Sequence, residues 1–242
     1  MSKIVTSCGI LKYKPQIIYV GIKQINKSVA LENLKIVANV MNKSGLKWGP
    51  TLGTLLGIIR DNDFITWDED IDLYIMEEDQ ERFLPMLFEF QKKGFDVIRF
   101  CRSGVLSIKR KGEYIDFYFM KNLGNGIRCA VGEVYLFEDY LTDTIQWDFK
   151  GCSLNVPRKY EEFLEFHYGD WRTPIKYADY EMTALRKMKT IISLYVKNHI
   201  PDFLFYPLFR QHHQPSLDRF KKKCESKGIN IGNEVSLSAY KK

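Results

Sequence analysis

The residues of this chain best suited to chemistry lie in two short stretches, Gly53-Thr54 and Asp70-Ile71-Asp72. From Asp70 to Met76 the apolar side chains alternate with others, which predicts a β-strand. Side chains two residues apart on a strand point the same way, about 6.6 Å apart, so Asp70 and Asp72 should project from one face. Two carboxylates this close repel each other unless a cation neutralises them or one of them takes up a proton. The pair therefore predicts a divalent-cation site.

Asp116 is the candidate third carboxylate of this site. It is the single acid within a predicted apolar strand from Tyr114 to Met120 and lies on the opposite face from Ile115, Phe117 and Phe119. Mg²⁺ prefers hard oxygen ligands, commonly one or two carboxylates together with substrate phosphates. Two simpler readings stay open: the Asp70/Asp72 pair is merely solvated, or Asp116 is a surface residue of an edge strand.

Gly53-Thr54 precedes a predicted short helix, Leu55 to Arg60. Free backbone N–H groups and the positive end of the helix dipole make such a helix start favourable for phosphate, and small residues let the phosphate approach the backbone. Arg60 either binds a phosphate or acts as a cation at the helix C-terminus. An anion cradle followed by paired carboxylates suits metal-assisted transfer at phosphorus.

Several other site classes are excluded by missing patterns. The sequence has no G-x-S-x-G, no Walker A loop and no G-x-G-x-x-G. An EF-hand reading from Asp61 fails because Ile65 and Thr66 occupy positions that need a ligand and a glycine. The five cysteines are scattered without a C-x-x-C pair, which argues against a disulfide framework and a zinc site and predicts a cytoplasmic protein.

The hydrophobic periodicity predicts a mixed α and β unit over residues 29–175. Residues 1–28 stay unassigned, and residues 176–242 are expected to form a helical, basic extension. The expected helices are residues 30–43, 55–60, 79–93 and 158–167, and a helical stretch is expected after Pro174 up to Pro201. The expected strands are residues 70–76, 95–100, 105–110, 114–120, 134–137, 144–149 and 153–156, and residues 46–52 are expected to form a short turn or strand.

The chain of 242 residues carries a net charge of +6, and the last forty residues hold eight basic and three acidic side chains. A basic tail is either a solvated helix face or a contact for phosphate-bearing partners or anionic lipid. The apolar run from Phe203 to Phe209 either packs on the rest of the protein, which we favour, or docks at the inner face of a membrane. No run is long enough to span a bilayer, and we expect no nucleic-acid partner.

The two chemistry-bearing stretches, read with their flanking residues, resemble the signature of the LicD/fukutin family. The similarity covers about residues 30–175 and lies in four segments, Gly53 to Arg60, Phe64 to Asp72, Ile115-Asp116-Phe117, and Val156-Pro157 with Tyr168 to Pro174. Two positions depart from the family pattern. Leu52 stands where the family commonly has a second glycine, and Thr66 where it has a proline.

The resemblance implies a nucleotidyltransferase-like mixed β-sheet flanked by helices. It also implies transfer of a phosphocholine or phosphopolyol group from a CDP-linked donor to a hydroxyl of a glycan or lipid-linked glycan. Asp70, Asp72 and Asp116 would then bind Mg²⁺ or Mn²⁺, with Asp116 as third ligand or as base. The candidate donor phosphate-binding residues are Gly53, Thr54, Arg60 and Arg172.

Two rival functions stay open at this point. One keeps the fold but transfers a nucleotidyl group from a nucleoside triphosphate to a protein or small molecule. The other is a non-catalytic phosphate-binding module of a glycan assembly complex.

Overall fold

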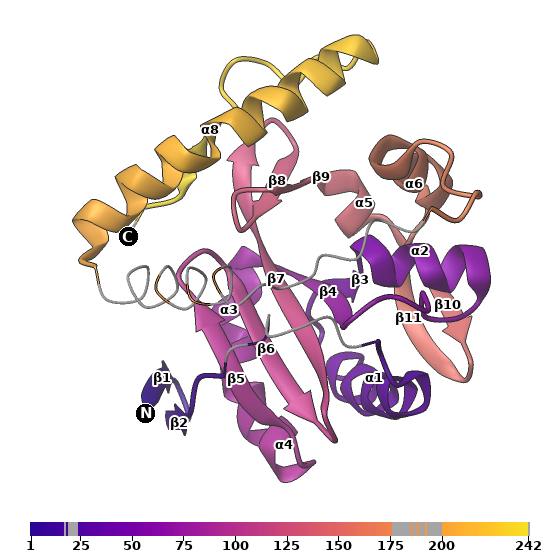
Figure 1. Cartoon of the computed structure of the whole chain (residues 1–242), viewed down its shortest axis with the longest axis vertical. Coiled ribbons are helices and arrows are strands. Elements are labelled where there is room, and N and C mark those ends of the chain that lie inside the picture. Colours follow the sequence, from indigo (N-terminus) through magenta and orange to yellow (C-terminus); the bar gives the residue numbers. More distant parts are fainter. Residues whose placement is uncertain are drawn as a thin grey trace.

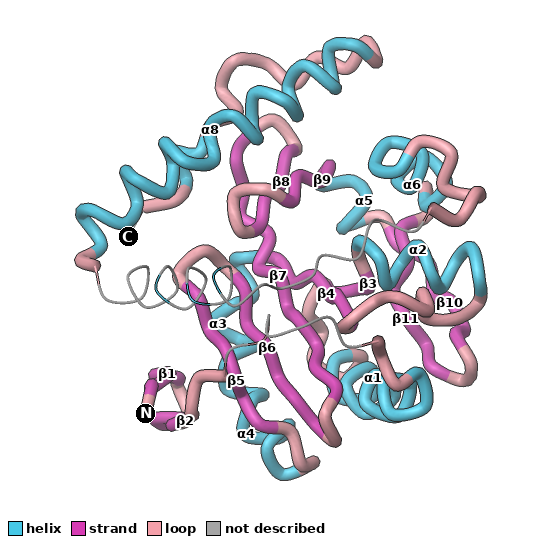
Figure 2. The backbone as a smooth tube through the Cα atoms, viewed as in Figure 1, coloured by secondary structure: helices cyan, strands magenta, loops and turns pink. Residues whose placement is uncertain are grey.

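The computed structural model describes residues 1–16, 18, 24–175, 185, 188, 192 and 200–241. Its centre is a β-sheet with strand order β3-β4-β7-β6-β5, and β8 and β9 continue from the far end of the long strand β7 (Figures 1 and 2). The strands of this sheet are β3 (Trp48–Pro50), β4 (Ile71–Met76), β5 (Asp96–Cys101), β6 (Val105–Arg110), β7 (Glu113–Gly124), β8 (Ile127–Ala130) and β9 (Val134–Phe137).

Two separate hairpins accompany the sheet: β1 (Ser2–Thr6) with β2 (Gly9–Tyr13), and β10 (Thr144–Phe149) with β11 (Cys152–Pro157). The described helices are α1 (Lys27–Met41), α2 (Leu52–Asp61), η1 (Glu77–Asp79), α3 (Gln80–Phe83), η2 (Leu84–Met86), α4 (Leu87–Lys92), α5 (Glu138–Thr142), α6 (Tyr160–Tyr168), α8 (Asp202–Ser226) and η3 (Leu237–Ala239).

The central sheet is mixed. Strand β4 runs parallel to β7, whereas β3 pairs with β4, β6 with β7, and β5 with β6 in antiparallel fashion. A parallel pair needs a crossover connection, and the helices α3 and α4 with the hairpin β5-β6 supply it between β4 and β7. The predicted α+β class, a mixed sheet flanked by helices, is confirmed.

Local sequence explains how several of these elements begin and end. Helix α1 begins where the Asn26 side chain accepts the N–H of Val29 at 3.2 Å, an N-cap contact. The helix expected over residues 79–93 is instead divided into η1, α3, η2 and α4, with Pro85 inside η2. Proline lacks an N–H donor and interrupts regular helical hydrogen bonding, which accounts for the division.

The strand expected over residues 70–76 is confirmed as β4, but it is more deeply buried than the sequence pattern indicated. Every residue of β4 is buried, so the strand is covered on both faces, whereas the alternation predicted only that one face lies in a core. Tertiary packing places α2 beside β4 and closes the second face. The sequence reading missed the hairpin β1-β2, strand β8 and helix α5. The helical stretch expected after Pro174 up to Pro201 lies almost entirely outside the described residues.

Helix α8 covers a second apolar core, which it forms with β8, β9 and the C-terminal segment (Figure 1). Phe205 and Phe209 are buried there, whereas Phe203, Leu204 and Leu208 are exposed on the same helix. The run 203–209 thus packs with one face only. No helix among the described residues combines the length and apolarity that crossing a membrane requires.

Candidate active site

Three carboxylates, from the neighbouring strands β4 and β7 and from the residue before β4, converge on one another. Asp72 on β4 and Asp116 on β7 are direct partners in the parallel pair, and Asp70 immediately precedes β4. One carboxylate oxygen from each of the three residues lies within 4.8 Å of the others. Asp72 and Asp116 are 7% and 0% exposed, and Asp70 is half-buried. The structure therefore brings together the three acids that the sequence singled out.

The electrostatics of this cluster are unfavourable for three full negative charges. Burial raises the pKa of Asp70 and of Asp72 well above the usual range, and the neighbouring carboxylates raise both further. Burial also raises the pKa of Asp116, although the Arg99 guanidinium and the Ser107 hydroxyl act in the opposite direction. Such a cluster calls for a proton or a cation, and three converging hard oxygen donors suit Mg²⁺ or Mn²⁺.

The first turn of α2 is hydrogen-bonded to β4 at Asp72. The Thr54 hydroxyl accepts the Asp72 N–H at 2.8 Å, and the Thr51 N–H donates to the Asp72 carbonyl at 3.0 Å. Both threonine side chains are buried, and the Thr51 hydroxyl has no hydrogen-bond partner among the described residues. The start of α2 is thereby fixed beside the carboxylates.

Leu52, the departure from the family pattern, lies in this same turn. Its φ of 49° falls in the left-handed region that favours glycine. The backbone thus keeps the conformation for which a glycine is suited, although the side chain is leucine. Non-glycine residues held in this region are often found at functional sites.

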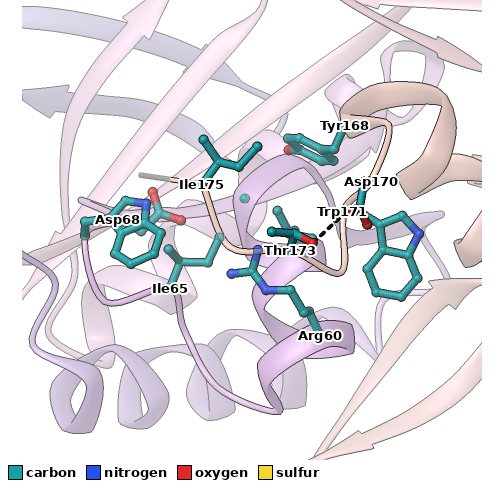
Figure 3. A pocket seen from close by; sticks show the side chains of 11 residues that line it. Arg60, Ile65, Asp68, Tyr168, Asp170, Trp171, Thr173 and Ile175 are labelled. Atoms are coloured by element: carbon teal, nitrogen blue, oxygen red, sulfur yellow. Dashed lines mark hydrogen bonds between the residues drawn. The ribbon is translucent and has the colours of Figure 1, made fainter. Parts of the chain in front are cut away.

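A cavity of about 230 Å³ extends from the start of α2 along one face of that helix. Three aromatic residues lie among its walls, and Asp68 and Trp171 lie at opposite ends of it (Figure 3). The lining residues are Gly53, Leu56, Arg60, Ile65, Trp67, Asp68, Tyr168, Asp170, Trp171, Thr173 and Ile175.

Gly53 and Asp68 form the end of the cavity at the start of α2. A Cβ atom at position 53 would lie 2.7 Å from a carboxylate oxygen of Asp68, so any side chain there would displace this carboxylate. Burial raises the pKa of Asp68 to about 6. Deeper along α2, the Arg60 side chain points toward Thr173, whose hydroxyl donates to Asp170 at 2.6 Å (Figure 3).

Of the four candidate phosphate-binding residues, two line the cavity and two do not. Gly53 and Arg60 line the cavity, and Arg60 is also paired with Asp61 at 2.7 Å. Thr54 is not among the lining residues, because its buried hydroxyl contacts the Asp72 backbone. Arg172 is not a lining residue either. Its guanidinium pairs with Glu161 at 2.8 Å and stacks over the Trp171 ring at 4.2 Å.

Two residues of the site were missed by sequence reasoning, Arg99 on β5 and Ser107 on β6. Ser107 donates from its hydroxyl to Asp116 at 2.5 Å, and Arg99 forms an ion pair with the same carboxylate. The available signal was an arginine within a largely apolar predicted strand, residues 95–100, but the partner of Arg99 depends on the strand register, which the sequence does not show.

Comparison with known proteins agrees with this geometry. Residues 50–159 match the profile described as "LicD/FKTN/FKRP, nucleotidyltransferase domain". The human protein named "Ribitol-5-phosphate transferase FKTN" is 28% identical over an alignment of 170 residues, and this alignment covers 63% of this chain and 35% of that protein. "Lipopolysaccharide cholinephosphotransferase LicD" of Haemophilus influenzae is 46% identical over 37 residues, 15% of this chain and 14% of that protein.

Among solved structures, the lincosamide antibiotic adenylyltransferase LnuA superposes with a TM-score of 0.41 and 14% identity, over 67% of this chain and 96% of that one. That likeness is too distant to bear on the site.

The matched profile and the mixed sheet are those of a nucleotidyltransferase-like domain. Residues 50–159 are therefore similar to the LicD/FKTN/FKRP family over that span. This region includes Gly53, Arg60 and the three acids, whereas Arg172 lies beyond it. The chain spans about a third of the length of fukutin, since the match covers 35% of that protein.

Proposed function

We propose that this chain transfers a substituted phosphate group, of the phosphocholine or phosphopolyol type, from a CDP-linked donor to a glycan hydroxyl. The observation that carries the proposal is the convergence of Asp70, Asp72 and Asp116 within 4.8 Å beside the first turn of α2. The relatives named as a ribitol-5-phosphate transferase and a cholinephosphotransferase support the class of group transferred. The catalytic unit in this proposal is residues 29–175.

The acid cluster is the proposed site for Mg²⁺ or Mn²⁺. The three acids fit such an ion because their donors are all carboxylate oxygens and because burial makes their mutual repulsion costly without a positive charge. When bound, the cation would neutralise negative charge on the phosphoryl oxygens.

The remaining roles follow from the placement of the side chains. The backbone N–H groups at the start of α2, near Gly53, would hold a donor phosphate, and the buried Thr51 hydroxyl is a further donor in the same turn. The cavity along α2 would hold a group attached to that phosphate. Arg60, within that cavity, would stabilise negative charge that develops on the departing nucleotide.

In the proposed reaction, the oxygen of the acceptor hydroxyl forms a bond to the phosphorus that bears the substituent. The bond from that phosphorus to the oxygen of cytidine monophosphate breaks, and the nucleotide leaves with the electron pair. The acceptor proton passes to a base. Asp116 is the candidate for that base unless it serves as third metal ligand.

The acceptor and the location of the reaction are further parts of the proposal. We infer a glycan or lipid-linked glycan acceptor and a cytoplasmic enzyme that contacts the inner face of the membrane through its basic C-terminal part. The exposed residues Phe203, Leu204 and Leu208 on α8 support that contact, because apolar side chains beside basic ones suit an anionic lipid surface.

A donor panel tests the proposal. The purified chain would be incubated with Mg²⁺, a glycan acceptor panel and CDP-choline, CDP-ribitol, CTP or ATP, and the released nucleotide and pyrophosphate would be measured. Release of CMP from a CDP-linked donor is expected, and it should disappear in Asp70→Asn and Asp72→Asn. Asp96→Asn, an exposed acid at the start of β5, is the matched control and should retain turnover.

Two results of this panel would contradict the proposal. Pyrophosphate release from CTP or ATP would instead indicate nucleotidyl transfer, the reaction for which the matched domain is named. Donor binding without turnover over the whole acceptor panel would indicate a binding module.

A further inference from the structure

An irregularity in β5 places Arg99 opposite Ser107 on β6, in line with the active-site acids Asp116 and Asp72. Between β5 and β6, Val97 pairs with Ile108 but the next pair is Arg99 with Ser107, so β5 carries one extra residue at Ile98. An extra residue of this kind is a β-bulge, and bulges redirect side chains next to functional sites. In a regular pairing Ile98, not Arg99, would be opposite Ser107. The bulge therefore replaces an apolar side chain with a guanidinium at this position.

The resulting row crosses four adjacent strands. Arg99 pairs with Ser107, Ser107 with Asp116, and Asp116 with Asp72, across β5, β6, β7 and β4. Residues directly opposite each other on neighbouring strands project from the same face, so this register alone places the four side chains side by side.

The contacts along the row fix the Asp116 carboxylate from two sides. The Ser107 hydroxyl donates to Oδ1 of Asp116 at 2.5 Å, and a terminal nitrogen of Arg99 donates to Oδ2. The Nε of Arg99 also donates to the Ser107 hydroxyl oxygen at 2.8 Å. Arg99 thus contacts both the carboxylate and the hydroxyl that orients it.

The row is also shielded from water. Ser107 and Asp116 are fully buried, and the Arg99 side chain is 13% exposed. Charge-assisted hydrogen bonds are stronger than neutral ones, and a low local dielectric strengthens them further. The carboxylate is therefore held in one orientation by the protein itself.

We propose that Arg99 and Ser107 are positioning residues that orient Asp116 toward Asp70 and Asp72 for cation binding. This inference rests on the proposed function, since it takes the three acids as the ligands of a divalent cation. Groups that hydrogen-bond to metal ligands fix the orientation of those ligands, and their loss typically weakens metal affinity or activity by about 10-fold to 100-fold.

The shape of the guanidinium distinguishes positioning from charge alone. Arg99 uses two nitrogens of one planar group to reach the serine and the carboxylate, and a lysine ammonium cannot reproduce that fork. A positive charge near the cluster would by itself repel a cation. Loss of that charge would then tighten cation binding, whereas loss of positioning would weaken it. The sign of the change separates the two effects.

The experiment measures Mn²⁺ affinity by isothermal titration calorimetry on the full chain. We expect Arg99→Met, Arg99→Lys and Ser107→Ala each to weaken Mn²⁺ binding by about 10-fold or more. The control is Arg110→Met. Arg110 lies on β6, like Ser107, and its guanidinium pairs with the Glu32 carboxylate at 2.9 Å. It is not part of the row that contains Asp116, so its loss should leave the Mn²⁺ affinity unchanged.

A double variant tests whether Arg99 acts through Asp116. In an Asp116→Asn background, Arg99→Met should change the Mn²⁺ affinity by less than about 3-fold, because the carboxylate that Arg99 orients is already absent. An equal loss in both backgrounds would overturn the inference. Wild-type or tighter affinity in Arg99→Met would overturn it as well.

A second variant and the wild-type titration separate failure of this inference from failure to fold and from failure of the proposed function. Ser107→Ala removes one hydroxyl, so it tests the same orientation if Arg99→Met does not fold. If the wild-type chain binds Mn²⁺ and the row variants bind it equally well, the inference fails while the proposed function stands. If the wild-type chain binds no Mn²⁺, the metal site of the proposed function itself fails.

Discussion

The Thr54 hydroxyl accepts a hydrogen bond from the Asp72 N–H, and we expect loss of this one oxygen atom to weaken both the fold and the acid cluster. Thr54 is 1% exposed and Asp72 is 7% exposed, so neither group can turn to water if the contact is lost. Thr54→Val keeps the shape of the side chain but removes the acceptor. A buried donor left without a partner costs about 1–3 kcal/mol of folding free energy.

That cost can be converted into a melting temperature. For a chain of this size, 1 kcal/mol corresponds to roughly 2–4 °C, so Thr54→Val should melt about 2–12 °C below the wild type. The same change frees the backbone at Asp72, so Mn²⁺ affinity and turnover should fall as well. Calorimetric melting and Mn²⁺ titration would measure the two effects.

Thr54→Ser is the matched control for this prediction. It keeps the hydroxyl and loses one buried methyl group, at a cost of about 1 kcal/mol. It should therefore retain wild-type Mn²⁺ affinity despite a small loss of stability. If Thr54→Val kept both the melting temperature and the Mn²⁺ affinity of the wild type, this contact would not position Asp72.

Two further predictions concern stability away from the acids. Burial lowers the pKa of His167 to about 4, so the folded chain keeps this histidine neutral while the unfolded chain takes up a proton below about pH 6.5. His167 therefore contributes a loss of stability as pH decreases from 6.5 to 4, opposite in sign to the contribution of the acids whose pKa burial raises. In urea unfolding, the stability of His167→Phe relative to the wild type should rise as pH decreases over this range; a difference that does not change with pH would contradict it. Gly132 has a φ of 76°, and a Cβ there would lie 2.6 Å from the His213 ring. Gly132→Ala should therefore loosen α8 from the second core and lower the melting temperature, and wild-type hydrogen exchange in α8 would refute this.

The sequence was sufficient to predict the acid cluster because its signals are local. Asp70 and Asp72 are two residues apart in a predicted strand, and Asp116 is the single acid of a predicted apolar strand. These patterns report which face a side chain takes. They do not report which strands are neighbours, so the direct pairing of Asp72 with Asp116 appears only in the folded sheet.

The features that were missed depend on long-range pairing. Arg99 reaches Asp116 because a bulge shifts the register of β5 against β6, and no periodicity in the sequence marks that shift. The cavity likewise depends on the segment around Tyr168 and Trp171 packing near α2, more than a hundred residues earlier in the chain. The division of the run 203–209 into buried and exposed residues depends on how α8 meets β8 and β9.

Cation-dependent melting tests the central claim most directly. A ligand that binds only the folded chain at 100 times its dissociation constant stabilises it by about 2.7 kcal/mol, or roughly 5–11 °C for a chain of this size. Saturating Mn²⁺ should raise the melting temperature of the wild type and of Asp96→Asn by this amount and leave Asp72→Asn unchanged. An equal shift in Asp72→Asn, or no shift in the wild type, would contradict the assignment of the three acids as a divalent-cation site.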